Sequence, residues 1–244
     1  MLRSLRACWR LARVVVHVLH GLAIVWWRFG ALDAAGRRER VMGWSRALLD
    51  HLGITLVVRG TPRPGAKLFV ANHISWLDIV AINATAPARF VSKAEVRRWP
   101  VLHRLVSAAD TLYLEREKRR DALRVVHQVA EALQAGDTVA VFPEGTTGTG
   151  HELLPFHANI LQAAIATEIP VQPIALRYSD RSDAISAAVA YVGDTTLVRS
   201  LWWVACANEL RVTVTLVEAQ GTRHLDRRAL AQRVRGLIEE ALAA

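Results

Sequence analysis

Short apolar runs alternate with stretches of helical spacing from about residue 54 to the end of the chain. A short apolar run between turn residues is typical of a buried strand. The runs that predict strands cover residues 54–58, 67–71, 89–92, 111–115, 139–142, 171–176, 187–192 and 211–217. The stretches that predict helices cover residues 76–83, 96–106, 119–135, 156–167 and 225–242. This alternation predicts an α/β fold, with a single mixed, mostly parallel sheet flanked by helices on both faces.

The first 30 residues follow a different pattern. Arginines at positions 3, 6, 10 and 13 share one face of a helix, and residues 14–27 then carry no Asp, Glu, Lys or Arg. That run is shorter than the ~20 residues that a membrane span needs. We therefore expect an amphipathic helix in the membrane surface, with its arginines at the lipid head groups and Trp26 and Trp27 at the interface. A single span and a cleaved signal peptide are alternatives, and a buried helix of a soluble protein is a further one that the basic face disfavours.

Helical spacing continues over residues 36–52, and Gly53 is expected to end this second helix. The chain is thus expected to divide into N-terminal membrane-associating helices, residues 1–52, and an α/β domain, residues 53–244. With 244 residues, the chain is long enough for one such domain with a full core.

Composition narrows the possible partners. The chain carries 31 Lys and Arg against 22 Asp and Glu, a net charge of +9, so an anionic partner is expected. Eight tryptophans favour an anionic membrane surface, and no helix-turn-helix, zinc-finger or RNP pattern supports a nucleic acid. The predominance of arginine over lysine suggests a GC-rich bacterial genome. The two cysteines have no metal-ligand spacing, so neither a metal nor a disulfide is expected.

The first candidate for chemistry is the pair His73 and Asp78, just after the apolar run 67–71. On one continuous helix the two side chains would point about 140° apart. They can meet if His73 precedes the helix and Asp78 lies in its first turn, which Ser75 would allow as the N-cap of a capping box with Asp78. A carboxylate bound to one imidazole nitrogen leaves the other nitrogen as a base. Taken alone, this spacing fits an ordinary helix cap equally well.

Two further segments suggest an anion site. Residues 142–150 follow a buried run and are rich in Gly and Thr, whose backbone N–H groups and hydroxyls suit an anion. Arg116 closes another apolar run, where its guanidinium could hold a phosphate. An ordinary loop and a solvated charged turn are the alternatives. A fourth segment, residues 169–174, contains two prolines that suggest an edge strand or a shaped pocket wall.

In this order, the four segments resemble the motif blocks of the glycerolipid acyltransferase family, whose best-known bacterial member is 1-acylglycerol-3-phosphate acyltransferase. The matching positions are Asn72, His73, Ser75 and Asp78, then 112–116, then 142–146, then 169–174. Thr147 departs from the third block, where the family often has arginine or serine, and this departure leaves the acceptor head group open.

The resemblance implies transfer of a fatty acyl group from an acyl thioester, acyl-CoA or acyl carrier protein, to the hydroxyl of a lysophospholipid. It implies that His73 is the general base, that Asp78 orients it, and that no bound cofactor or metal is needed. Substrate-binding roles are implied for four residues: Arg116, Glu144, Gly145 and Thr146. It also implies a place at the bacterial inner membrane, with the active site facing the cytoplasm.

Three other functions are compatible with parts of the sequence. O-acylation of a lyso-ornithine-type aminolipid would suit Thr147. A non-catalytic basic protein that binds membrane or nucleic acid would explain the charge, but it would not explain His73 and Asp78. A serine hydrolase is disfavoured because the sequence has no G-x-S-x-G.

Overall fold

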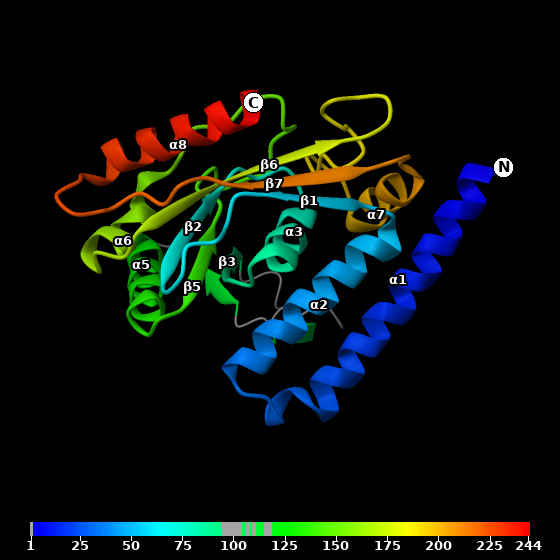
Figure 1. Ribbon diagram of the computed structural model, residues 1–244, viewed down its shortest axis with the longest axis horizontal. Coiled ribbons are helices and arrows are strands. Elements are labelled where there is room, and N and C mark those ends of the chain that lie inside the picture. Colours follow the sequence, from blue (N-terminus) through cyan, green and yellow to red (C-terminus); the bar gives the residue numbers. More distant parts are fainter. Residues whose placement is uncertain (1, 94–103, 106–107, 109–110, 115–118) are drawn as a thin grey trace.

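The chain folds around one seven-stranded sheet (Figure 1). The computed structural model describes residues 2–93, 104–105, 108, 111–114 and 119–244. Its strands are β1 (Thr55–Arg59), β2 (Lys67–Ala71), β3 (Arg89–Lys93), β4 (Leu112–Leu114), β5 (Thr138–Val141), β6 (Val171–Ser179) and β7 (Arg211–Leu216). Its helices are α1 (Leu2–Trp27), α2 (Ala34–Leu52), α3 (Leu77–Thr85), α5 (Arg119–Gln134), α6 (Gln162–Ala166), α7 (Leu197–Cys206) and α8 (Arg227–Ala243), with 3-10 turns η1 (Phe29–Ala31) and η3 (Ala158–Leu161).

The strand order is β1-β7-β6-β2-β5-β3-β4, and every neighbouring pair is parallel except β6 with β7. The predicted α/β class, with its mixed and mostly parallel sheet, is therefore confirmed. The strand predicted at residues 187–192 is wrong, because this segment forms turns between β6 and α7. The helix predicted at 96–106 falls almost entirely outside the described residues.

The prolines of residues 169–174 do not mark an edge, because β6 lies inside the sheet between β7 and β2. Pro173 comes just before Ile174, the first residue of β6 that pairs with β7. Its carbonyl accepts from the backbone N–H of Val217 at 3.0 Å, and its own nitrogen points the same way. Pro173 therefore lacks the second bond that a residue with an N–H could form with Val217, and the loss is confined to one bond at the end of the β6–β7 ladder.

Two apolar cores cover the two faces of the sheet. One core joins the sheet to α2 and α3 through side chains such as Leu49, Leu77 and Leu176. The other joins it to α5 and α8 through side chains such as Val129, Val141 and Val234. Figure 1 shows α8 along one face, with α3 and α2 on the opposite side. Both faces are buried at the centre, which explains why β2 is apolar without alternation.

Helix α1 lies outermost, alongside α2 (Figure 1). The two helices approach closely at Gly21, where a Cβ atom would lie only 2.5 Å from the indole nitrogen of Trp44. His17 stacks on the ring of Trp44, and its Nε2 lies 3.0 Å from the carbonyl oxygen of that residue. His17 and Gly21, which interrupt the apolar run, thus face α2, whereas His20 is exposed.

Three arginines of α1 bind the C-terminal end of α7, which the sequence did not indicate. Arg3 Nε donates to the carbonyl of Cys206 at 3.0 Å, and Arg10 Nη1 donates to those of Ala205 and Ala207 at 3.0 and 2.8 Å. Arg6 Nη1 donates to Asn208 Oδ1 at 2.9 Å. These three arginines therefore bind groups that α7 leaves unpaired at its C-terminus, and a contact of the basic face with lipid head groups stays a prediction.

Candidate active site

His73 and Asp78 meet in the turn between β2 and α3. His73 follows the carboxyl end of β2, and Asp78 lies in the first turn of α3, which begins at Leu77. The Nδ1 atom of His73 lies 2.8 Å from Asp78 Oδ2. The turn thus brings together two side chains that a continuous helix would hold apart.

The Asp78 carboxylate is fully buried and is surrounded by donors. Besides the imidazole, its Oδ2 accepts from the backbone N–H groups of Ile74 at 2.6 Å and Ser75 at 2.9 Å. A carboxylate in such surroundings is an acceptor, so Nδ1 of His73 carries the hydrogen and Nε2 of the neutral ring carries a lone pair. Nε2 makes no hydrogen bond to any described residue, and the His73 side chain is 19% exposed.

The capping box expected at this helix forms only in part. Asp78 reaches back to the backbone N–H of Ser75, as the acidic residue of a capping box does. However, the helix begins one residue later than expected, with Trp76 as N-cap, and the buried Ser75 hydroxyl has no hydrogen-bond partner among the described residues. Asp78 rather than Ser75 therefore fixes the start of α3.

Tyr178, which the sequence did not single out, completes the surroundings of Asp78. Its hydroxyl donates to Asp78 Oδ1 at 2.9 Å, and the side chain is fully buried at the end of β6. Burial, together with the charge of Asp78, raises the pKa of Tyr178 well above 10, so the hydroxyl stays protonated and remains a donor. The signal was available: a tyrosine in a strand buried on both faces needs a partner for its hydroxyl.

The segment Phe142–Glu144 holds His73 from the other side. The Phe142 ring stacks on the imidazole with centroids 4.0 Å apart and planes at 10°. Glu144 Oε1 accepts from the backbone N–H of His73 at 2.7 Å, and its Oε2 accepts from that of Leu154 at 3.0 Å. Burial raises the pKa of Glu144, although these two N–H bonds act in the opposite direction. The geometry gives Glu144 a part in positioning His73.

The remaining candidate residues lie along the loop after β5. Gly145 adopts the left-handed φ of 70° that a tight turn requires, and Thr146 beside it is exposed. The Thr147 hydroxyl donates to the carbonyl of Tyr191, so it ties the loop to the segment before α7. The backbone N–H of Gly148 donates to the carbonyl of His73 at 2.7 Å. Arg116 lies outside the described residues.

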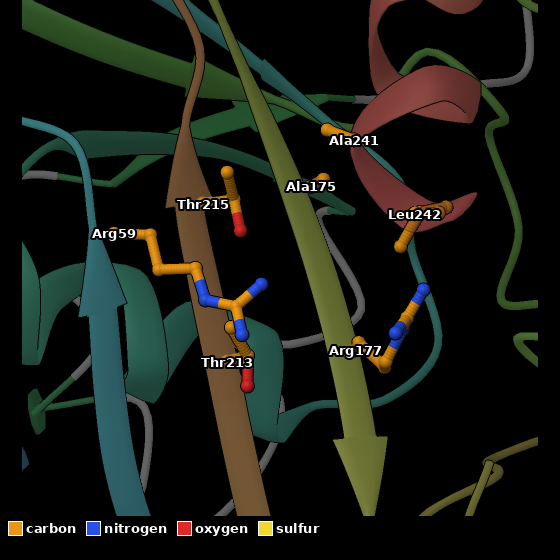
Figure 2. A pocket seen from close by; sticks show the side chains of 7 residues that line it. All are labelled: Arg59, Ala175, Arg177, Thr213, Thr215, Ala241 and Leu242. Atoms are coloured by element: carbon orange, nitrogen blue, oxygen red, sulfur yellow. The ribbon is translucent and has the colours of Figure 1, made fainter. Parts of the chain in front are cut away.

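A separate hollow lies on the opposite face of the sheet, beneath the end of α8 (Figure 2). It is lined by Arg59, Ala175, Arg177, Thr213, Thr215, Ala241 and Leu242. Along β6 these side chains alternate with Leu176 and Tyr178, which face α3, so the hollow is separated from His73 by the sheet. It corresponds to the polar, open face of the antiparallel pair β6–β7. Over the part of the chain that the structure describes, no group of His, Cys, Asp and Glu side chains could hold a metal ion.

Comparisons with known proteins agree on one family. The acyltransferase family model matches residues 56–177. The 1-acyl-sn-glycerol-3-phosphate acyltransferase of Neisseria meningitidis serogroup B is 37% identical over 210 residues, 85% of this chain and 82% of that protein. The lyso-ornithine lipid O-acyltransferase of Pseudomonas aeruginosa is 34% identical over 245 residues, 98% of this chain and 94% of that protein.

The fold has a close counterpart as well. The crystal structure of a 1-acyl-sn-glycerophosphate acyltransferase from Thermotoga maritima superposes with a TM-score of 0.75, covering 99% of this chain and 96% of that one. At 19% identity this likeness shows the fold alone. Together with the family model and the relatives, it leads to one conclusion: the chain belongs to the acyltransferase family and is an O-acyltransferase of lipid metabolism.

Proposed function

We propose that the enzyme transfers a fatty acyl group from an acyl thioester to the free hydroxyl of a lysophospholipid. The first candidate acceptor is 1-acylglycerol-3-phosphate, which would give phosphatidic acid, and the donor would be acyl-CoA or an acylated carrier protein. The observation that carries this proposal is the contact of 2.8 Å between His73 Nδ1 and the buried Asp78. It supplies a base whose second nitrogen is open to a substrate.

In the proposed mechanism, Nε2 of His73 takes the proton from the acceptor hydroxyl as its oxygen attacks the thioester carbonyl. The tetrahedral intermediate then collapses, the C–S bond breaks, and the leaving thiolate takes the proton from the imidazolium. The charge of Asp78 would stabilise that imidazolium and keep the ring in the required tautomer. General base catalysis of this kind contributes about 10²–10⁴ in rate. No step needs a covalent enzyme intermediate.

The residues around the pair would divide into two roles. Phe142, Glu144 and Tyr178 would position His73 and Asp78, in keeping with their contacts. Gly145 and Thr146 would contact the acceptor head group, since they lie on the loop whose N–H at Gly148 binds the His73 carbonyl. A contact between Arg116 and an acceptor phosphate, and a direct contact of Glu144 with substrate, stay predictions from the sequence.

A lyso-ornithine lipid is the second candidate acceptor, and two observations favour it. The Pseudomonas aeruginosa enzyme that bears this name aligns over 98% of the chain, compared with 85% for the Neisseria meningitidis enzyme. In addition, Thr147 supplies a neutral hydroxyl engaged with the Tyr191 carbonyl, where the motif can carry an arginine able to bind phosphate in a bidentate manner.

Helix α1 would attach the enzyme to the membrane. Apolar side chains point away from the protein at Leu5, Trp9, Ala12, Val16 and Leu19, and Trp9 and Val16 are 66% and 67% exposed. By length and composition alone, residues 3–27 could also cross a bilayer. The bonds from Arg3 and Arg10 to α7 favour a helix in the membrane plane, because a span would draw α7 and its charged partners into hydrocarbon.

This attachment would place the enzyme on the inner membrane of a bacterium, with the site facing the cytoplasm, where acyl thioesters are made. The excess of basic residues would add attraction to anionic lipids. Changing Leu5, Trp9 and Val16 to serine should weaken binding to vesicles while leaving α1 packed, since all three are exposed. Unchanged sedimentation with vesicles would contradict the attachment.

The substrate assignment is tested by incubating the purified enzyme with labelled acyl-CoA or labelled acyl carrier protein and a panel of lysolipids. The panel contains 1-acylglycerol-3-phosphate, lyso-ornithine lipid and lysophosphatidylethanolamine, and products are identified by mass spectrometry. Phosphatidic acid as the main product would support the first candidate. Exclusive acylation of lyso-ornithine lipid would replace it with the second, and transfer to none of the three would refute the proposal.

A further inference from the structure

Helix α7 carries an exposed apolar face that the fold does not use. Val198 is 77% exposed and Trp202, one turn further along the same side, is 40% exposed. The opposite side is buried through Ser200 and Val204. The guanidinium of Arg199 lies over the ring of Trp203, 4.5 Å from its centroid. The helix contains no acidic residue, so apolar contact dominates its outer face.

Helix α7 packs directly against α1, the helix that carries the exposed apolar stripe. Ala7 packs against Ala205 and Cys206 in a small buried cluster. Arg3 and Arg10 add three hydrogen bonds, since their guanidinium groups donate to three successive carbonyls, those of Ala205, Cys206 and Ala207. Ala205 lies on the same side of α7 as Val198 and Trp202, so the exposed apolar face of α7 is adjacent to the helix proposed to attach to the membrane.

Helix α7 is also hydrogen-bonded to the turn from His73 to Asp78, which we call the catalytic turn. The indole N–H of Trp76, which lies between His73 and Asp78 in the sequence, donates to the Ser200 hydroxyl at 3.0 Å. The segment that leads into α7 adds a second link, because the backbone N–H of Tyr191 donates to the carbonyl of Ile74 at 3.1 Å. A contact made by α7 is thus one hydrogen bond away from the turn that holds the base.

We propose that α7 is a second bilayer-contacting element, whose Val198 and Trp202 enter the lipid interface and hold the catalytic turn at the membrane surface. This inference rests on the membrane attachment in the proposed function. Three features single out a bilayer as the occupant: an apolar outer face, an indole suited to the interface, and continuity with α1. An acidic carrier protein fits less well, because Arg199 is the only basic residue of the helix.

Fluorescent labels at three positions test this placement. With exposed Cys8 changed to alanine and buried Cys206 kept, a nitrobenzoxadiazole label is attached at Val198→Cys on α7, at Val16→Cys on α1, or at Arg233→Cys on α8. The α8 label is the matched control, since Arg233 is exposed on the helix that covers the other face of the sheet. Each protein is mixed with vesicles of phosphatidylethanolamine and phosphatidylglycerol.

The proposal predicts a blue shift of the labels at Val198 and Val16 and no shift at Arg233. A shift at Val16 alone would overturn the role of α7 while leaving the membrane attachment of α1 intact. No shift at either position would refute the attachment itself and this inference with it. A shift at Val198 that depends on protein concentration without vesicles would assign the face to a second copy of the chain and overturn the bilayer assignment.

Two variants connect this surface to turnover. Changing Val198 and Trp202 together to serine should weaken vesicle binding about tenfold while leaving turnover of detergent-dispersed lysolipid unchanged. Ser200→Ala should leave vesicle binding unchanged and lower kcat at constant KM, because it releases Trp76 from α7. Equal vesicle binding by the double variant and the wild type would contradict the surface, and an unchanged kcat in Ser200→Ala would contradict its link to the turn.

Discussion

Replacing Tyr178 by phenylalanine removes one hydroxyl and keeps the buried ring. That hydroxyl is the donor to Asp78 Oδ1, whereas Oδ2 keeps its three donors from His73, Ile74 and Ser75. A hydrogen bond to a charged group contributes about 1.5–3 kcal/mol, so we expect the free energy of unfolding to fall by that amount. Because Asp78 is fully buried, water cannot replace the lost donor without a change in packing.

The catalytic effect should be smaller, since Tyr178 acts on His73 only through Asp78. If half of the bond's value is lost specifically in the transition state, kcat falls about three- to tenfold. KM should stay unchanged, because a side chain with no exposed surface does not touch the acceptor.

The assay is steady-state acyl transfer alongside urea denaturation. Tyr191→Phe is the matched control, because that hydroxyl makes no hydrogen bond to any described residue and its change should affect neither quantity. Wild-type kcat and stability in Tyr178→Phe would refute the positioning role. A rise in KM with kcat unchanged would refute it equally, by moving the effect to substrate binding.

Three further changes test the supports of the site. Burial raises the pKa of Glu144 above 4.5, so the folded protein binds this proton more tightly than the unfolded chain does. The free energy of unfolding should therefore fall as pH rises from 4.5 toward the raised pKa. Urea titrations between about pH 4 and 7 should show this fall in the wild type and not in Glu144→Gln. Asn72→Ala removes an amide whose Oδ1 accepts from the Leu176 N–H at 2.8 Å and whose Nδ2 donates to the Leu176 carbonyl at 3.0 Å. The free energy of unfolding, measured by urea denaturation, should fall by about 1–3 kcal/mol. A fall below about 0.5 kcal/mol would contradict this structural role of Asn72. Arg10→Ala should destabilise the α1–α7 contact and lower the melting temperature, whereas exposed Arg38→Ala should not; equal melting of the two would contradict the clamp.

The fold class was predictable because strand and helix patterns alternate along one chain and both faces of the sheet are buried. The strand predicted at residues 187–192 failed because this apolar segment is buried through Val189 and bonded by Tyr191 to the turn between His73 and Asp78 without forming a ladder. An apolar run signals burial, and only partner strands make it a strand.

The site was predictable where motifs are local and was missed where contacts are distant. His73 and Asp78 lie in one turn, so spacing and a helix start could bring them together. Tyr178 is 100 positions from Asp78, and no local pattern relates them. The bonds of Arg3, Arg6 and Arg10 to the end of α7 were missed for a similar reason, because a periodic basic face fits lipid head groups and the end of another helix equally well.

The central claim is that His73 is the general base, and His73→Ala tests it most directly in a purified acyl-transfer assay. Turnover of labelled acyl thioester with the preferred lysolipid should fall by about 10²–10⁴. The melting temperature should stay close to that of the wild type, because the partly exposed imidazole is not a core residue. Turnover within about threefold of the wild type in a folded variant would contradict the claim.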